Sequence, residues 1–443
     1  MRKKFIFSLF ACLLVASLIM TGGCKKEEAK TIKIGVIGPM QYVQGEHHWF
    51  GATLARDEIN AAGGITITVT DENGKTHEET YQIELIKADS NEMSSPTDAA
   101  SAMTRLITVD KAQFVIGGFR TEAVYPMMDV AMDNKTIFLG CGAATKELCM
   151  KAVGDGYERY KYWFRVTPFA SDKLVSNSLE TLATAGAIMK AGLGIEGKIK
   201  VAILAEQATW ADAMVAAYQA YVPKYGMEVV GTWRPSATAT EVTAELTAIQ
   251  KSGAHIILTI ISGPVGIPFA RQLGELQIPV ASVGINVEAQ KDGFWEATNK
   301  FGAYETTLNT YAKGVAQTPK TVPFFEAFVK ANGETPTYCA GTYDAIYLLK
   351  EAIERADSLA SDAVVVELEK TDYQSTSGRI VFIGKDQPTP HDVTYGPGYV
   401  TGIAIQWQNG EMKCVWPWNW KDIKYEGTVQ WQIPDRVLKF YGK

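Results

Sequence analysis

The chain has 443 residues, of which 47% are hydrophobic, 10% aromatic and 21% charged, and its formal net charge is −6 at pH 7. This composition excludes a disordered or fibrous protein and supplies enough apolar side chains for two or three units of normal domain size. The negative net charge argues against nucleic acid as a partner, because a surface that binds phosphates needs an excess of Lys and Arg.

The N-terminus has the pattern of an export signal. Basic residues precede an apolar run over 5–20, which at about 16 residues is short for a membrane span. Small residues then lead into Cys24 and resemble a bacterial lipobox, although lipoboxes usually carry Leu where this chain has Thr21. We predict a signal peptide over 1–23 and a lipidated tether over 24–31, with secretion without lipid as the alternative. Cleavage would leave 420 residues and, with three positive charges removed, a net charge of −9.

After the tether, short apolar runs alternate with longer amphipathic segments. The first series predicts strands over 32–37, 81–87, 114–116 and 137–139, and helices over 50–61, 96–109 and 123–133. The second predicts helices over 171–191, 208–224, 241–252 and 265–276, and strands over 200–205, 227–232, 256–261 and 280–284. Strands that alternate with helices form parallel sheets covered on both faces, so we predict two α/β lobes of one doubly wound architecture.

The tail follows a different pattern. It predicts helices over 324–330 and 342–356 and strands over 379–383, 400–408 and 412–416. Five tryptophans also fall in it, at positions 407, 416, 418, 420 and 431, and we interpret most of them as packing along the second lobe.

Four cysteines would remain after processing, namely Cys141, Cys149, Cys339 and Cys414. An exported protein folds where disulfides can form, and four cysteines allow three pairings. We favour the local pair of Cys141 with Cys149. No CxxC pair, His-rich tract or metal-ligand spacing is present in the sequence, so we expect neither a metal nor a cofactor.

Short enzyme motifs are also missing from the sequence. It contains no GxSxG, HExxH or GxxxxGK[ST], and no GxGxxG that opens a helix after a strand. The adjacent His47 and His48 are the best candidates for metal binding or acid–base chemistry, but neighbours in sequence rarely point at one site. We interpret them as part of a loop or helix start, and we predict no catalytic residue.

The turns that follow strands are the first place to look for a ligand site, because open parallel sheets bind ligands at the carboxyl ends of their strands. Two turns of the first lobe contain glycines and then a hydroxyl residue at a helix start, Thr121 and Thr145. An anionic group would fit there. Turns of the second lobe carry Trp210 and Asn286. Helix capping by the threonines and packing by the tryptophan are the alternatives.

Five short segments carry a resemblance to a known family: IGVIGPM at 34–40, INAAGG at 59–64, VIGG at 115–118, GAAT at 142–145 and YDA at 343–345. With these segments in order, the chain from about residue 32 to the low 370s resembles the branched-chain amino-acid binding proteins of ABC importers. Their fold is the type 1 periplasmic-binding fold, so the resemblance implies two Rossmann-like lobes joined by three crossovers.

The resemblance also implies where the lobes divide. Lobe one would comprise residues 31–168 and 306–376, and lobe two residues 169–305 and 377–443. The crossovers would lie near 165–170, 302–309 and 375–379.

In that family a hydroxyl residue after the third strand of lobe one holds the ligand carboxylate, together with backbone and hydroxyl groups after the fourth strand. Thr121 matches the first position, and Ala143 and Thr145 match the second. An aromatic residue at the start of a second-lobe helix closes over the ligand, and Trp210 matches it. The resemblance therefore implies that these four residues contact the ligand.

Two departures from the family bear on the ligand. Where amino-acid binders place an acid that neutralises the ligand ammonium, this chain has Asn286, with Glu288 two residues further on. Arg120 precedes the hydroxyl anchor, and a guanidinium there could bind a carboxylate with two hydrogen bonds, whereas the alternative is a solvent-facing charge. A carboxylate without an amino group thus competes with a branched-chain amino acid.

We therefore predict an exported solute-binding lipoprotein in the periplasm or on the outer face of the cell membrane. It would bind a small carboxylate-bearing ligand by hinge closure, as a monomer, and dock on the permease subunits of an ABC importer. The alternatives are a binder of organic or aromatic acids, a ligand sensor that reports to a membrane receptor, and an exported enzyme on the same scaffold.

Overall fold

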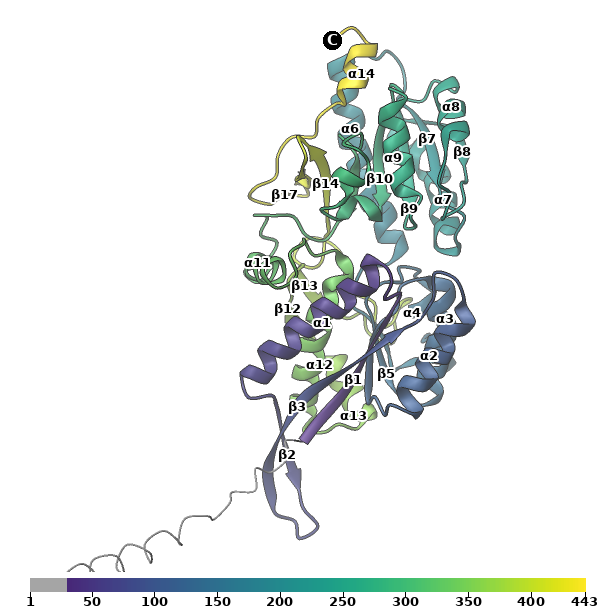
Figure 1. Ribbon diagram of the computed structural model, residues 1–443. Coiled ribbons are helices and arrows are strands. Elements are labelled where there is room, and N and C mark those ends of the chain that lie inside the picture. Colours follow the sequence, from purple (N-terminus) through teal and green to yellow (C-terminus); the bar gives the residue numbers. More distant parts are fainter. Residues whose placement is uncertain (1–29) are drawn as a thin grey trace, which may run out of the picture.

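Two open sheets, each covered by helices, form two lobes that lie one above the other in Figure 1. The computed structural model describes residues 30–443, so the predicted signal peptide and the predicted lipidation site Cys24 lie outside the described residues. Within this range, most neighbouring strands of both sheets are parallel. The predicted architecture of two α/β lobes is confirmed.

The first sheet has the strand order β2-β3-β1-β4-β5-β6. Its strands are β1 (Lys30–Gly38), β2 (Ile65–Thr70), β3 (Thr76–Asp89), β4 (Phe114–Gly117), β5 (Ile137–Gly140) and β6 (Trp163–Arg165). All neighbours are parallel except β2, which forms a hairpin with β3. β4 and β5 are buried along their whole length, as expected for apolar strands between two layers of helices.

Four long helices cover this sheet: α1 (Val43–Ala61), α2 (Pro96–Thr108), α3 (Thr121–Asp133) and α12 (Thr342–Ala356). α1 packs on α12 at one face, and α2 packs on α3 at the other (Figure 1). In α12 the buried Ile346, Leu349 and Ile353 recur at the spacing of one helical face, which explains why the sequence predicted this helix with its observed bounds.

The second sheet has the strand order β15-β14-β11-β10-β9-β7-β8. Its strands are β7 (Lys200–Ala205), β8 (Glu228–Trp233), β9 (Ile256–Ile261), β10 (Ala281–Asn286), β11 (Thr306–Asn309), β14 (Ile403–Gln408) and β15 (Glu411–Trp416). The first five are parallel, whereas β14 is antiparallel to β11 and to β15. The tail of the chain therefore completes the second lobe.

Helices of the second lobe are α6 (Ser171–Leu193), α7 (Thr209–Tyr221), α8 (Thr243–Lys251), α9 (Gly266–Glu275), α10 (Phe294–Ala297) and α14 (Asp435–Phe440). Shorter or peripheral elements are α4 (Glu147–Met150), α5 (Tyr157–Tyr160), α11 (Thr321–Asn332), α13 (Ser361–Leu368), β12 (Asp372–Gln374), β13 (Arg379–Val381), β16 (Trp418–Trp420) and β17 (Ile423–Lys424). Of the tail tryptophans, Trp407, Trp416 and Trp431 are buried, whereas Trp418 is exposed.

The lobe boundaries differ from the predicted ones in two places. The sequence predicts residues 306–309 in lobe one, but β11 is a strand of the second sheet, so the second crossover follows it. The prediction of 377–443 in lobe two also fails for its first part, because residues 377–395 pack on β6 of lobe one, where the ring of Phe382 meets that of Phe164. The third crossover therefore lies between this segment and β14.

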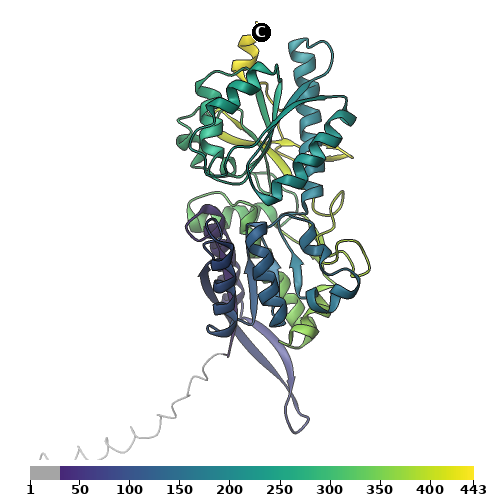
Figure 2. The same ribbon diagram turned by 90° about the vertical axis from the view of Figure 1, so that its right-hand side faces the viewer.

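β2 and the first half of β3 form a hairpin that projects from lobe one at the end remote from lobe two (Figures 1 and 2). The sequence predicted only 81–87 of these two strands. Over 65–70 Ile and Val alternate with Thr, and Ile65 and Ile67 are buried, whereas residues 71–80 have no apolar side chain and are mostly exposed. Thr66 and Thr80 face one another across the hairpin, with their hydroxyl oxygens 3.1 Å apart.

The predicted disulfide between Cys141 and Cys149 is wrong. Each of the four cysteines in the described range is free and buried. The Cys141 thiol lies 3.6 Å from the Leu139 carbonyl, and the Cys149 sulfur lies 3.8 Å from the Arg165 guanidinium. Proximity in sequence does not bring the two sulfurs together, because each side chain faces its own partner.

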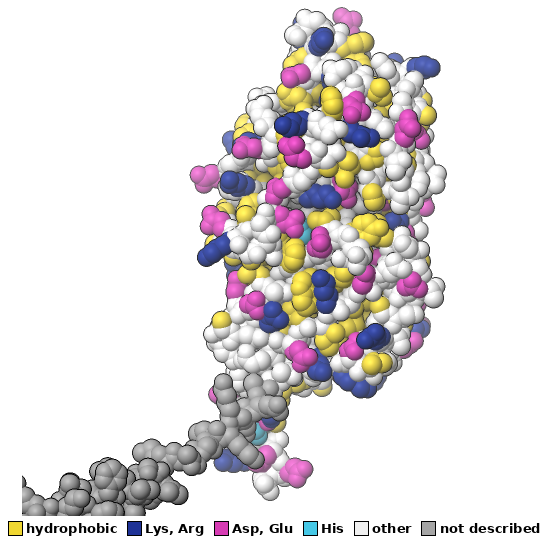
Figure 3. Space-filling view, viewed as in Figure 1, with side chains coloured by type: hydrophobic (Ala, Val, Ile, Leu, Met, Phe, Trp, Pro, Cys, Tyr) yellow, Lys and Arg dark blue, Asp and Glu magenta, His cyan; other side chains and the backbone are white. Residues whose placement is uncertain are grey.

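Charges of both signs are scattered over the surface in Figure 3, with apolar side chains between them. This face therefore has no continuous basic or acidic patch. Within residues 30–443, no helix is both long enough and apolar enough to cross a membrane.

Candidate ligand-binding site

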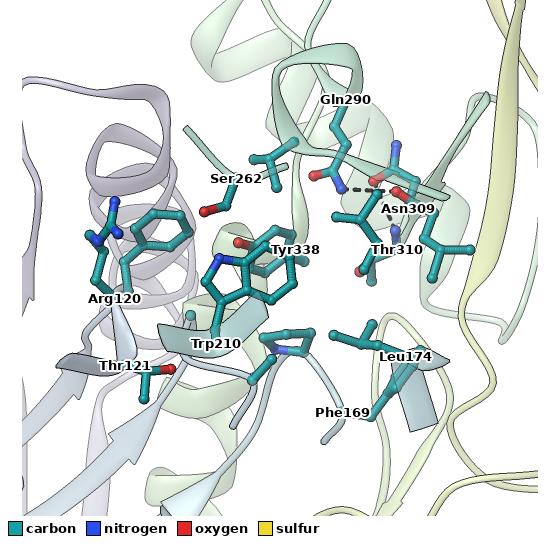
Figure 4. A pocket seen from close by; sticks show the side chains of 17 residues that line it. Arg120, Thr121, Phe169, Leu174, Trp210, Ser262, Gln290, Asn309, Thr310 and Tyr338 are labelled. Atoms are coloured by element: carbon teal, nitrogen blue, oxygen red, sulfur yellow. Dashed lines mark hydrogen bonds between the residues drawn. The ribbon is translucent and has the colours of Figure 1, made fainter. Parts of the chain in front are cut away.

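A pocket lies between the lobes, where turns after strands of both sheets face one another. The empty space between its walls, including open solvent at its mouth, is about 660 Å³. Most of its wall is apolar or aromatic. The polar side chains in it that are not aromatic are Arg120, Thr121, Ser262, Gln290, Asn309 and Thr310 (Figure 4). No Asp or Glu is among the described residues that line the pocket.

Thr121 and Thr145, two of the predicted ligand contacts, lie side by side at the lobe-one wall. Thr121 begins α3 after β4, and Thr145 lies in the turn after β5. Because β4 and β5 are neighbours in the sheet, the two turns meet, and the hydroxyl oxygens are 2.7 Å apart. Thr121 lines the pocket, and Thr145 lies behind it. One hydroxyl donates to the other, which leaves the pair one hydrogen for a ligand.

Arg165 holds the turn after β5 from behind. It ends β6 and is fully buried, and its guanidinium donates to the carbonyl of Ala143 and, at 2.6 Å, to that of Thr145. The predicted contact Ala143 therefore points its carbonyl at Arg165, and its neighbours Gly142 and Ala144 line the pocket instead.

Asp392 balances the charge of Arg165. Its carboxylate lies 3.0 Å from the Arg165 Nε, and neither side chain is open to solvent. Burial raises the pKa of Asp392, and the guanidinium acts in the opposite direction. The sequence signal for this pair was a single arginine inside the apolar run 162–166, but nothing in the sequence indicated its partner.

Glu92 holds the turn after β4. One oxygen of its buried carboxylate accepts from the backbone N–H groups of Phe119 (2.9 Å) and Arg120 (2.6 Å), and the other accepts from the Ser90 hydroxyl (2.7 Å). Burial raises the pKa of Glu92 to about 7, while these hydrogen bonds lower it. The two N–H groups are thus unavailable to a ligand carboxylate, which leaves the hydroxyl pair and the turn after β5.

Arg120 lines the pocket, but its charge is already paired. Its guanidinium contacts the Glu122 carboxylate through Nε at 2.8 Å and through Nη2 at 2.6 Å. The predicted grip on a ligand carboxylate would have to compete with this ion pair.

In lobe two, Glu206 organises the cleft wall, and the sequence did not indicate it. This buried residue follows β7, and its Oε1 accepts from the Trp210 indole at 2.8 Å and from the Ser262 hydroxyl at 2.5 Å. Oε2 accepts from the backbone N–H groups of Ser262 (2.9 Å) and Gly263 (2.7 Å). Trp210, a predicted contact, is thereby held against the pocket with its N–H engaged (Figure 4).

The structure places Asn286 away from the pocket. Its amide nitrogen donates to the carbonyl of Gly266 at 3.1 Å and to Glu305 at 3.0 Å, inside lobe two. Side chains alternate along a strand, so Ile285 faces the cleft and Asn286 the opposite side of the sheet. The predicted contact is therefore not made in this structure.

Two further residues follow β10. Glu288 is buried and paired with Lys291 at 2.5 Å, and it does not line the pocket. Gln290 does line it; its amide nitrogen donates to the Leu308 carbonyl at 2.9 Å, and its amide oxygen has no partner among the described residues.

His47 and His48 both lie in α1, and each has a separate structural partner. His47 Nδ1 lies 2.9 Å from the Thr337 hydroxyl, and His48 Nε2 lies 3.0 Å from the Cys141 carbonyl. Burial lowers the pKa of His48 to about 4. Within residues 30–443, no group of His, Cys, Asp and Glu has the arrangement of a metal site.

Two similar α/β lobes, three crossovers and a cleft walled by both lobes define a two-lobed binding protein that can close on a small molecule. The sequence model of the family described as "Periplasmic binding protein" matches residues 31–396, and the chain belongs to this family. The family is one of solute-binding proteins rather than enzymes. Its identification confirms the predicted resemblance and the preference for a binder over an exported enzyme.

Relatives and solved structures agree with this assignment. An "Amino acid binding protein" of Pseudomonas aeruginosa is 25% identical over 373 residues, which cover 80% of this chain and 86% of that protein. A Streptococcus pneumoniae branched-chain amino acid transporter substrate-binding protein, solved with isoleucine, has a TM-score of 0.66 at 21% identity over 86% of this chain and 98% of its own. A solute-binding protein of R. palustris, solved with benzoate, has a TM-score of 0.67 at 17% identity over 87% and 95%.

Proposed function

We propose that this protein is the extracytoplasmic solute-binding component of an ABC importer and binds a small carboxylate, an amino acid or a similar acid, between its lobes. The observation that carries the proposal is the Thr121–Thr145 hydroxyl pair at the wall of a mostly apolar pocket. Hydroxyl groups at a helix start are suited to hold a carboxylate, and the apolar wall is suited to the rest of a small organic molecule.

The mechanism follows from the position of the pocket. Trp210 and Ser262 belong to lobe two and Thr121 to lobe one, so a ligand that contacts all three favours approach of the lobes. Its differential affinity for the closed over the open form drives the closure, and the closed form would dock on a permease.

A thermal-shift screen tests the proposal. The purified protein is heated with L-leucine, L-isoleucine, benzoate, 4-hydroxybenzoate and short dicarboxylates. A ligand at 100 times its Kd should stabilise the folded state by about 2.7 kcal/mol, and calorimetry then gives the Kd. If no carboxylate raises the melting temperature, the proposal is overturned.

A second candidate ligand class is an organic or aromatic acid without an amino group. Asn286 faces away from the pocket, and no acidic side chain of the described residues lines it, so a ligand ammonium would find no carboxylate at its surface. Tighter binding of benzoate than of every amino acid would favour this class.

Export and lipidation remain part of the proposal and rest on the sequence of residues 1–24. Mass spectrometry of the N-terminal peptide from membranes should find an acylated Cys24. In Cys24→Ala cells the protein should appear in the soluble fraction, and retention of this variant in the membrane would contradict lipidation.

A further inference from the structure

The turn after β9 offers the cleft a hydrogen-bond acceptor whose direction is set by a buried carboxylate. The single hydroxyl hydrogen of Ser262 is donated to Glu206 at 2.5 Å, and its backbone N–H is donated to the same carboxylate at 2.9 Å. Ser262 lines the pocket, so only the lone pairs of its oxygen remain for a ligand.

The other partners of Glu206 fix the direction of its hydrogen bond with the Ser262 hydroxyl. Both of its oxygens accept N–H groups that can only donate, from Trp210 on one side and from Ser262 and Gly263 on the other. The carboxylate is therefore an acceptor in all four of its hydrogen bonds, and the hydroxyl must point its hydrogen at it.

Gln290 provides a second, independent acceptor on the same side of the pocket. Its amide nitrogen is engaged by the Leu308 carbonyl, and its buried amide oxygen has no partner within the described residues. In Figure 4 the side chains of Ser262 and Gln290 extend into the region above Trp210 and Tyr338. A buried acceptor without a partner is costly, and a donor on the ligand would remove that cost.

From these contacts we infer that Ser262, oriented by Glu206, is a specificity-determining residue that receives a hydrogen-bond donor of the ligand. This inference rests on the proposed function and deepens it: the ligand carries a carboxylate toward Thr121 and an amino or hydroxyl group toward lobe two. Ser262 touches the ligand, and Glu206 is a positioning residue. The Ser262 oxygen would accept the hydrogen bond that amino-acid binders of the family make with an acidic residue, at the position where this chain has Asn286.

The test compares two pairs of probes that differ only in the donor. L-Leucine is compared with 4-methylpentanoate, which lacks the amino group, and 4-hydroxybenzoate with benzoate, which lacks the hydroxyl. In at least one pair the wild-type protein should bind the donor-bearing member tenfold or more tightly, because a site built to accept a hydrogen bond rejects the analogue without it. The pair that shows the preference identifies the donor.

Ser262→Ala should reduce that ratio to near one. Ser282→Ala is the matched control, because Ser282 also donates to a buried carboxylate of lobe two, that of Glu305, but does not line the pocket. S282A should keep the wild-type ratio. If S262A does not fold, Ser262→Cys, whose sulfur is a weak acceptor, should show the same loss.

The outcomes separate the inference from the proposed function. Carboxylates that bind without a donor preference, or a preference that survives in S262A, would overturn the role of Ser262 and leave the proposed function standing. Failure of all four probes to bind the wild-type protein would overturn this inference, and the proposed function falls only if every other carboxylate of the thermal-shift screen also fails to bind.

Discussion

Corresponding turns of the two lobes are held by buried carboxylates with different partners. Glu92 binds the turn after β4 in lobe one, and Glu206 binds the turn after β9 in lobe two. Glu92 has one oxygen bonded only to the Ser90 hydroxyl, which can donate or accept, whereas both oxygens of Glu206 face N–H groups. Lobe one can therefore tolerate a proton or an amide at this position, and lobe two cannot.

The next turn in each lobe differs as well. The turn after β5 rests on the charge of Arg165, whereas the neutral amide of Asn286, at the end of β10, donates to Gly266 at the start of α9 and to Glu305. One architecture thus presents turns backed by a carboxylate and a guanidinium in lobe one, and a turn backed by a carboxylate in lobe two. The difference teaches that the topology brings the turns together, whereas buried polar residues decide which hydrogen bonds remain for a ligand.

Removal of Arg165, which supports lobe one, should have the largest effect on stability. We expect Arg165→Met to lower the free energy of unfolding by roughly 3–5 kcal/mol, because Asp392 would be left buried without its partner. Urea denaturation measures the loss. Arg165→Met combined with Asp392→Asn should recover part of it, and Arg379→Met, which removes an exposed ion pair with Asp372, should have a much smaller effect. Equal losses in R165M and R379M would contradict the role given to Arg165.

The tolerance of lobe one for a proton on Glu92 can be measured from the pH dependence of the free energy of unfolding. The pKa of Glu92 is raised from its ordinary value of 4.5 to about 7, so between these pH values the folded state holds a proton that the unfolded state has released. Stability should therefore fall by roughly 3 kcal/mol as the pH rises through this window. Glu92→Gln, whose amide can donate to Ser90, should remove this dependence and be more stable than the wild type at pH 8. Urea denaturation at pH 5 and pH 8 gives the difference.

Glu206→Gln is the contrast in lobe two. Its amide nitrogen must face an N–H donor whichever way it turns, so this variant should lose stability, by about 1–3 kcal/mol, at both pH values. If E92Q and E206Q behave alike, the distinction between the two carboxylates does not hold.

Loss of the hydroxyl pair should affect binding rather than folding. Thr121→Ala with Thr145→Ala removes both partners of one hydrogen bond, so no buried group is left unsatisfied, and carboxylate affinity should fall about 10- to 100-fold. Calorimetry measures the change. Thr104→Ala with Thr108→Ala, which removes two hydroxyls bonded to backbone in α2, should leave affinity unaltered. Wild-type affinity in T121A/T145A would exclude the pair from the site.

Arg120→Ala should have the smallest effect. Because the guanidinium is paired with Glu122, we expect less than about a fivefold loss of carboxylate affinity. Glu122→Gln should free the guanidinium and tighten binding of carboxylates. A hundredfold loss in R120A, measured by calorimetry, would show that Arg120 grips the ligand directly.

Periodicity predicted most of the fold, because apolar side chains at helix or strand spacing are a local signal. The strands Lys200–Ala205 and Ile256–Ile261 have their predicted bounds. In the hairpin of β2 and β3, the alternation of Ile and Val with Thr over 65–70 is a strand signal that the prediction missed, whereas the polar residues 71–80 carry none. Residues 377–395 were misplaced because their partners on β6 are distant in sequence.

The candidate site was predictable where it depended on strand order alone. Thr121 and Thr145 meet because their turns follow neighbouring strands. Asn286 was not predictable, since β10 continues to that residue and the alternation along the strand turns its side chain away. Glu92, Glu206 and Arg165 were missed because their partners come from other turns, which no local pattern reveals.

The C-terminal strands also bear on the behaviour of the protein at high concentration. β14 pairs along β11, with Ala404 opposite Leu308, and β15 then covers β14. Without this pair of strands, β11 would end the second sheet with a row of free N–H and C=O groups, which invites pairing with another chain. We therefore expect a chain cut before Ile403 to self-associate more readily than the full chain, whose second sheet ends on β15 instead of β11.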